Sequence, residues 1–270
     1  MKTLGKISAN LIAELYNENK PVFMIDDIVR INKTSRPNAA KLVFDLIKRK
    51  VIHRLKKGKY IIIPQELGSA DTFIGNLYVM AKEIVNTQNY YIAFYSAMKY
   101  WGMTTHPVIK VFIVTSKRQF PPQELADRIS FVFVDKKNIW GVKSKWITKT
   151  ATVNISDIEK TIVDALSHPE YCGGITEVAK GIWLVKDKIN FKRLIKYTLK
   201  YNKKVVAKRL GYILEILGID AGDTFTKLKT YVSNRYDLLD PTSTKKSIDK
   251  NSWHLIDNIG SKQILKIISA

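Results

Sequence analysis

The apolar and polar positions of the first fifty residues follow a helical period. Apolar side chains recur every three or four positions over residues 4–15, which predicts a helix there. A second short helix is predicted over residues 25–31, because Asp26 and Asp27 then lie in a first turn, where the helix dipole favours acidic side chains. Ser35 provides an N-cap for a third helix, and Pro37 is tolerated in its first turn. That helix is expected to bury Ala39, Leu42, Val43, Leu46 and Ile47.

Beyond residue 50 the period becomes that of a strand. Residues 51–55 and 60–63 are predicted strands, joined by a tight basic turn over residues 56–59 and ended by Pro64. Three short helices followed by a basic hairpin are the element order of a winged helix-turn-helix. We therefore predict a winged helix-turn-helix DNA-binding domain over residues 1–66.

The rest of the chain mixes the two periods. Helices are predicted over residues 73–85, 90–102, 157–166, 176–184, 190–201 and 205–217, and strands over residues 108–115, 129–134, 139–146 and 150–155. Ser156 is expected to cap the helix that follows it, with Glu159 completing a capping box. Residues 65–70 form a short connector to a larger mixed helix and strand domain of residues 67–270. The predicted fold class is α+β.

Composition adds a strong electrostatic bias. The chain has 45 Lys and Arg against 24 Asp and Glu, which gives a formal net charge of +21. Such an excess favours a polyanionic partner: DNA, RNA, an anionic membrane surface or an acidic protein. A lysine-rich surface that only keeps the protein soluble is the alternative.

The basic residues concentrate on the predicted third helix and hairpin. Between Ser35 and Tyr60 there are nine Lys or Arg and one acid, Asp45. A recognition helix presents its N-terminal side chains to base edges in the major groove, and a basic wing can lie along the phosphates. We expect the helix side chains to face base edges and the three hairpin lysines to face phosphates. The predicted DNA-binding residues are Ser35, Arg36, Asn38, Lys41, Arg54, Lys56, Lys57 and Lys59. A winged helix used for protein contacts, with a solvated basic face, is the alternative.

A second basic stretch covers residues 186–209, with ten Lys or Arg and one acid, Asp187. It predicts a possible second surface for nucleic acid or an acidic protein. Solvated faces of two helices are the alternative reading of the same pattern. The residues of this predicted surface are Lys192, Arg193, Lys196, Lys200, Lys203, Lys204 and Lys208.

Signs of catalytic chemistry are missing from the sequence. The four histidines have no metal-ligand spacing, and the single cysteine, Cys172, lies beside two glycines and is expected to be a packing residue. There is no Walker loop, dinucleotide fingerprint or nucleophile elbow. We therefore expect no catalytic residue, no metal site, no cofactor and no enzyme activity, although a nuclease site assembled from distant carboxylates remains an alternative.

Localisation is predicted from the same absences. No apolar run is long enough for a transmembrane helix, and the first residues lack the apolar core of a signal peptide. One cysteine allows no internal disulfide, which fits a reducing compartment. The predicted localisation is cytoplasmic, with no membrane partner.

Several segments resemble AbiEi-type antitoxins, the transcriptional regulators of type IV toxin–antitoxin systems. The N-terminal matches are FMIDDI at residues 23–28, SR at 35–36, LIKRKVIHR at 46–54 and GKY at 58–60. The later matches are YIAFYSAMKYWG at residues 91–102, ISDIEKTIVDAL at 155–166, PE at 169–170, GG at 173–174 and KRLGYILE at 208–215. The resemblance extends to about residue 217. Two positions depart from the pattern: Lys50 stands where a helix-ending glycine is usual, and Met24 where a capping Ser or Thr is usual.

The resemblance implies a non-enzymatic autorepressor and antitoxin. Such proteins bind double-stranded operator DNA through the N-terminal domain, and their C-terminal domain counteracts a nucleotidyltransferase-type toxin, AbiEii. Many act without a stable toxin complex, so direct contact with the toxin is left open. Two alternatives remain: a plain repressor of another locus, and a nucleic-acid enzyme or RNA-binding protein that uses the large domain.

Overall fold

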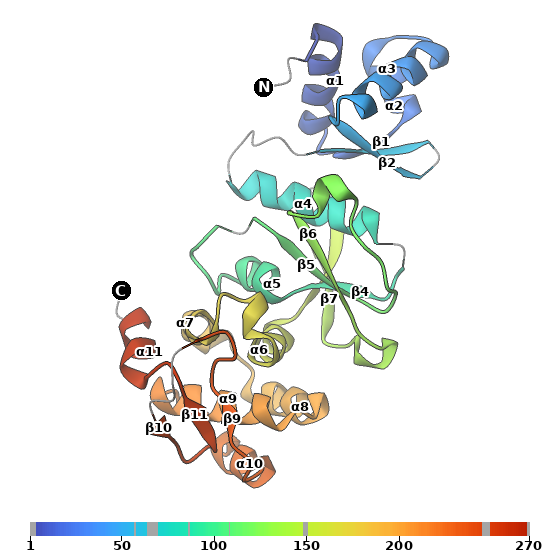
Figure 1. The fold of residues 1–270 in the computed structure, drawn as a ribbon. Helices are drawn as coiled ribbons and strands as arrows, with labels where there is room; N and C mark the ends of the chain where they lie inside the picture. Colours follow the sequence, from blue (N-terminus) through green and yellow to red (C-terminus); the bar gives the residue numbers. More distant parts are fainter. Residues whose placement is uncertain are drawn as a thin grey trace. The chain divides into compact units, whose positions relative to one another are not determined.

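The described residues contain both helices and strands, which makes the protein a mixed α+β fold, as predicted (Figure 1). The computed structural model describes residues 4–56, 58–63, 70–85, 87–107, 109–147, 151–244 and 249–268. The chain divides into two compact units. The first comprises Met1–Tyr90, Ile109–Phe133 and Ser144–Asn154, and the second comprises Tyr91–Val108, Val134–Lys143 and Ile155–Ala270.

The first unit begins with three helices and a small antiparallel sheet. The elements are α1 (Lys6–Asn17), β1 (Val22–Met24), α2 (Ile25–Asn32), α3 (Arg36–Lys48), β2 (Ile52–Lys56) and β3 (Lys59–Ile62). The three helices and the hairpin lie where the apolar pattern predicts them. The strand β1 was not predicted, because three residues are too few to show a period; β3 pairs with it and gives the sheet order β1-β3-β2.

These elements enclose a core of their own. Phe23 of β1 packs its ring 5.9 Å from that of Tyr60 in β3. The buried members of this cluster are Leu11, Ile12, Leu15, Phe23, Ile28, Ala39, Val43, Leu46, Val51, Ile52, Tyr60 and Ile62. The predicted domain boundary at residue 66 lies outside the described residues and stays a prediction.

A longer helix and a five-stranded sheet follow. The helix is α4 (Ala70–Ile84), and the sheet has the order β6-β5-β4-β8-β7. Its strands are β4 (Tyr90–Ala93), β5 (Val111–Thr115), β6 (Ile129–Phe133), β7 (Val142–Trp146) and β8 (Thr152–Ser156), with β5 parallel to β6 and β4 parallel to β8. Two 3-10 turns, η1 (Gln123–Leu125) and η2 (Lys136–Asn138), lie between the strands.

The aromatic segment predicted as one helix over residues 90–102 is a strand followed by a helix. Its first four residues form β4, all of them buried, and only Phe94–Trp101 form the helix α5. The prediction of a single helix was wrong because a short, wholly buried strand has no alternation to distinguish it from a buried helix. Gly102 does end α5, in the left-handed conformation at φ 73°.

The second unit is mainly helical. It contains α6 (Ile158–Ser167), η3 (Pro169–Tyr171), α7 (Ile175–Leu184), η4 (Lys186–Lys188), α8 (Phe191–Tyr201), α9 (Lys204–Ile216) and α10 (Thr224–Tyr231). A small sheet of order β10-β11-β9 and a last helix complete it: β9 (Asp237–Leu238), β10 (Asp249–Lys250), β11 (Leu255–Asp257) and α11 (Ser261–Ile268).

The capping box predicted for α6 is replaced by a different arrangement. The N-cap is Asp157, whose carboxylate accepts a hydrogen bond from the Lys160 amide at 2.9 Å. Ser156 ends β8, and its hydroxyl lies 2.7 Å from that of Thr161. Glu159 is fully buried and binds Arg193, so it does not reach back to a capping residue. Sequence spacing alone does not distinguish two adjacent capping residues.

Candidate nucleic-acid interface

The N-terminal half of α3 presents polar and basic side chains to solvent. Its buried face is Ala39, Val43 and Leu46. The predicted residues Ser35, Arg36, Asn38 and Lys41 are all exposed at the start of this helix. The start of α3 therefore leaves exposed all four residues that the sequence assigned to DNA contacts on this helix.

A three-residue turn sets α3 against α2. Lys33 ends α2 in the left-handed conformation at φ 48°, and the Thr34 amide donates to the Val29 carbonyl at 3.3 Å. Arg36 follows at the start of α3, and its guanidinium lies 3.3 Å from the Asp26 carboxylate. Both partners of this ion pair are mostly exposed, so the pair contributes little to stability and leaves Arg36 available to a ligand.

Sequence reasoning missed two lysines that lie beside these residues. Asn38 and Lys41 line a hollow of about 590 Å³ together with Lys6 of α1 and Lys33 of the turn. Asp45 is the one acidic residue in the described lining of this hollow. The start of α1 belongs to a different helix, so only the tertiary packing of α1 against the turn shows that Lys6 belongs here.

The hairpin residues divide into three groups. Arg54 on β2 is exposed, in agreement with its predicted role. Lys59 on β3 is mostly buried and pairs with Glu83 of α4, so a carboxylate already neutralises its charge. This placement differs from the expectation that Lys59 faces phosphates. Lys57 and the side chain of Lys56 lie outside the described residues.

The second basic stretch loses Lys208 to the interior, and Arg193 is held in an ion pair. Arg193 makes two bonds to Glu159, of 2.8 and 3.0 Å, and Glu159 is 0% exposed. Lys208 is itself 0% exposed, with its ammonium 2.7 Å from Asp237. A buried charge needs a charged partner, which is why Lys208 is structural, and its inclusion in a surface was wrong. The side chain of Arg193 stays 38% exposed while it pairs with the buried Glu159, so its place in the surface stays a prediction.

Five lysines of the predicted second surface remain exposed. Lys192, Lys196 and Lys200 follow one another at intervals of four residues along α8. The Lys203 ammonium donates to the Ser167 hydroxyl at 3.1 Å, and partial burial lowers its pKa from the ordinary lysine value. The Lys204 ammonium donates to the Tyr231 carbonyl at 2.7 Å. The stripe on α8 is therefore the part of the predicted surface that presents its charge to solvent.

Few groups in the described part of the chain are arranged for catalysis or metal binding. Within the described residues, no group of three or more His, Cys, Asp or Glu side chains is placed to hold a metal ion. Cys172 is completely buried, and burial raises its pKa well above the ordinary thiol value, so it packs as a neutral thiol. Every helix in the described part of the chain is too short or too polar to span a bilayer.

Comparison with known proteins gives a structural match. Over 100% of this chain and 97% of the other, the fold is similar to the crystal structure of the RV2827C protein from Mycobacterium tuberculosis, with a TM-score of 0.62 and 14% identity. At this identity the likeness concerns the fold alone. No family model matches the sequence. No curated protein matches it either.

Proposed function

We propose that the first unit carries a winged helix-turn-helix that binds double-stranded DNA. The order α1-β1-α2-α3-β2-β3, the sheet order β1-β3-β2 and the short turn between α2 and α3 support this reading. The observation that carries the proposal is the exposed cluster at the start of α3: Ser35, Arg36, Asn38 and Lys41.

The chemistry of this cluster suits base recognition. An arginine or lysine can donate to the two acceptors of guanine in the major groove, and an asparagine can bind adenine in two places. Arg36, Asn38 and Lys41 are the candidates for these contacts. Arg54, Lys56 and Lys57 are proposed to bind phosphates, with counterion release as the driving force. Lys59 is proposed to contribute less, because Glu83 compensates its charge.

A gel-shift titration on the DNA upstream of the chain's own gene tests the proposal. R36A and N38A should each weaken binding by about 1–3 kcal/mol and relax base preference, whereas a K56A/K57A variant should weaken binding to all sequences and lower the salt slope by about one unit per lost contact. K117A is the matched control, since Lys117 is an exposed lysine of the same unit outside α3 and the hairpin. Unchanged affinity in the α3 variants would remove the interface from α3.

We further propose that the protein is a cytoplasmic, non-enzymatic autorepressor and antitoxin that counteracts an AbiEii-type nucleotidyltransferase toxin. The support is the resemblance in sequence. Its matching segments fall in α3 and the hairpin of the first unit and in α6 and α9 of the second. A nucleotidyltransferase gene beside this one would favour an antitoxin over a repressor of another locus. Metal-dependent cleavage of DNA or RNA by the purified chain would favour the enzyme alternative.

The exposed stripe on α8 is the proposed antitoxin surface. Like charges four residues apart weaken a helix slightly, so Lys192, Lys196 and Lys200 carry a small cost in stability that a polyanionic partner would offset. We expect K192E/K196E/K200E in the full chain to abolish rescue of cells that express the neighbouring toxin, while K180E on α7 preserves rescue. Full rescue by the triple variant would remove the stripe from the mechanism.

A further inference from the structure

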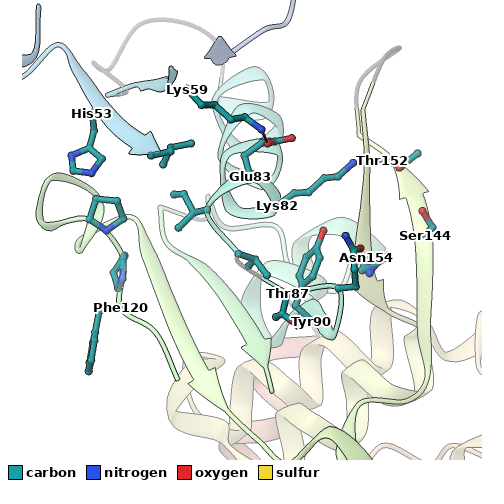
Figure 2. Close-up of a pocket in the computed structure, with 16 residues that line it drawn as sticks. His53, Lys59, Lys82, Glu83, Thr87, Tyr90, Phe120, Ser144, Thr152 and Asn154 are labelled. Atoms are coloured by element: carbon teal, nitrogen blue, oxygen red, sulfur yellow. Dashed lines mark hydrogen bonds and ion pairs between the residues drawn. The ribbon is translucent and has the colours of Figure 1, made fainter. Parts of the chain in front are cut away.

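The first unit contains a polar cavity of about 960 Å³ beside the hairpin (Figure 2). One wall is the hairpin, through His53 and Leu55 of β2 and Lys59 of β3. The C-terminal part of α4, the loop at residues 120–122 and three neighbouring strands of the large sheet form the others. Its volume is at the upper end of the range of small-molecule sites.

The sheet floor of the cavity is polar, which a packed core would not require. In β8, Thr152 and Asn154 face the cavity while Val153 and Ile155 are buried on the other face, since side chains alternate along a strand. Ser144 of β7 lines the same cavity. Thr152 and Asn154 are half-buried and Ser144 is exposed, so a ligand that enters the cavity can reach all three polar side chains.

The floor also includes the Tyr90 hydroxyl of β4. Burial raises the pKa of Tyr90 to about 12, so the phenol stays protonated at neutral pH and can donate a hydrogen bond. Together with Thr152, Asn154 and Ser144, it gives the floor three hydroxyls and one amide as possible donors.

The cavity has a cation in excess. The Glu83 carboxylate is already paired with Lys59, whereas Lys82, one residue earlier on α4, has no carboxylate partner among the described side chains. Figure 2 shows Lys82 extending from α4 toward the strands that carry Ser144, Thr152 and Asn154. An ammonium above several hydroxyl and amide donors suits a phosphate group, whose oxygens accept several hydrogen bonds at once.

The rim adds an aromatic ring. Phe120 is 91% exposed and is followed by Pro121 and Pro122, which restrict the loop. An exposed aromatic ring beside a group of donors that suits a phosphate can stack on a planar base.

From this arrangement we propose that the cavity binds a free nucleoside phosphate and that the bound ligand alters the DNA affinity of the hairpin. The first part stands on the cavity alone. The second rests on the proposed DNA-binding function, because His53, Leu55 and Lys59 belong both to the cavity wall and to the hairpin. A ligand that fills the cavity contacts the hairpin through His53, Leu55 and Lys59. It also competes with the ion pair between Lys59 and Glu83, which joins the hairpin to α4.

Titration calorimetry of the full chain tests the site, with AMP, GMP, CMP, UMP and inorganic phosphate as probes. K82Q removes the cation, and T152V removes one hydroxyl while keeping a β-branched strand residue. K117Q is the matched control, an exposed lysine outside the cavity in the same unit. At least one nucleotide should bind, with affinity about tenfold lower in K82Q, about threefold lower in T152V and unchanged in K117Q.

Thermal unfolding without ligand checks that each variant folds. Absence of binding by every probe, or equal binding by wild type and K82Q, would overturn the site. Tighter, Lys82-dependent binding of a single-stranded oligonucleotide than of any mononucleotide would overturn the assignment to a free ligand.

Gel shifts with and without the bound nucleotide test the coupling. DNA affinity should change at least threefold in wild type and not in K82Q. Nucleotide binding without an effect on DNA affinity would overturn the coupling and keep the site. Failure to bind any DNA would instead refute the DNA-binding proposal, while the calorimetric result still decides the cavity.

Discussion

At the scale of single residues, Lys50 shows how a departure from a sequence pattern is accommodated. It ends α3 in the left-handed conformation at φ 54°, the position where glycine is usual. The Lys50 amide donates to the Ile47 carbonyl at 2.8 Å, and the Val51 amide donates to the Leu46 carbonyl at 2.9 Å, which together form a Schellman motif. The backbone geometry is thus retained and Lys50 bears the strain.

Replacing Lys50 by glycine should therefore stabilise the first unit. We expect K50G to raise its unfolding free energy by up to about 1 kcal/mol, because glycine adopts positive φ without a steric penalty. Differential scanning calorimetry of the full chain measures the change. K48G, inside the last turn of α3, is the control and should lower stability by about 0.5–1 kcal/mol. A fall in stability for K50G would show that the left-handed residue is not strained.

At the scale of elements, the start of α2 depends on one carboxylate. Asp27 accepts hydrogen bonds from the Met24 amide at 2.8 Å and from the Lys20 ammonium at 2.5 Å. Burial alone would raise the pKa of Asp27, but these bonds together with the nearby positive charges hold it below its ordinary value. Asp27 therefore compensates for Met24, which stands at the capping position in place of Ser or Thr.

The sign of this shift predicts an acid-sensitive contribution to stability. A lowered folded-state pKa stabilises the fold above the ordinary pKa, and the contribution disappears as pH falls through the folded value, below about pH 4. D27N should cost about 1–2 kcal/mol at pH 7 and proportionally less at low pH. Urea unfolding from pH 7 to pH 2.5 provides the comparison. D26N, at the exposed neighbouring carboxylate, should unfold with the pH dependence of wild type. If the stability of D27N also followed the wild-type pH dependence, the acid-sensitive contribution would not come from Asp27.

The helix α6 contains a buried ion pair inside an aromatic cluster. Lys160 is 1% exposed, and its ammonium lies 2.6 Å from Asp164 one turn later and 4.3 Å from the centre of the Trp140 ring. Tyr91 donates to the other carboxylate oxygen of Asp164 at 3.1 Å. The contacts of this pair are therefore structural.

Breaking this pair from one side should be far more costly than removing its charges together. D164N keeps an acceptor for Tyr91 but leaves the Lys160 charge buried without a counter-ion, at a cost of about 3–5 kcal/mol. The double variant K160M/D164N removes both charges and should recover a large part of that loss. Chemical denaturation of wild type, D164N and the double variant measures the three unfolding free energies. A double variant no more stable than D164N would mean that the buried charge does not determine the cost.

At the scale of the whole molecule, the described residues near the C-terminus pack against helices that lie earlier in the chain. Trp253 is fully buried, lies against Gly211 of α9 and donates through its indole to Glu215. Asp240 accepts from the Ile175 amide at 2.8 Å at the start of α7. The C-terminal segment is therefore part of the second unit's core.

The contact between Trp253 and Gly211 can be tested with a single methyl group. A Cβ at Gly211 would lie 2.2 Å from the nearest atom of the Trp253 ring, so G211A requires the indole to move. Alanine favours a helix by about 1 kcal/mol over glycine, yet overpacking should reverse the sign and give a net loss of about 1–3 kcal/mol. G211A/W253L should lose less than the sum of the two single variants. Additive losses, measured by thermal unfolding, would rule out the contact.

The sequence by itself determined the features that depend on neighbours close in the chain. Apolar spacing located α1, α2 and α3, the basic hairpin and the helices α6, α7, α8 and α9 of the second unit, because helical and strand periods are local properties. The N-cap at Ser35 placed Arg36, Asn38 and Lys41 in the first two turns of α3, where all three are exposed. Net charge and the clustering of basic residues depend on composition and also needed no coordinates.

Only the tertiary structure decided which charges remain available. Lys59 meets Glu83 across 24 positions, Arg193 meets Glu159 across 34 and Lys208 meets Asp237 across 29, so three of the predicted surface cations are paired. The strand β1 and the polar cavity under the hairpin likewise require segments far apart in sequence to meet. A local pattern records which face of an element is apolar, but the partner of a side chain depends on how distant elements pack, and that packing decides whether a lysine binds a ligand or supports the fold.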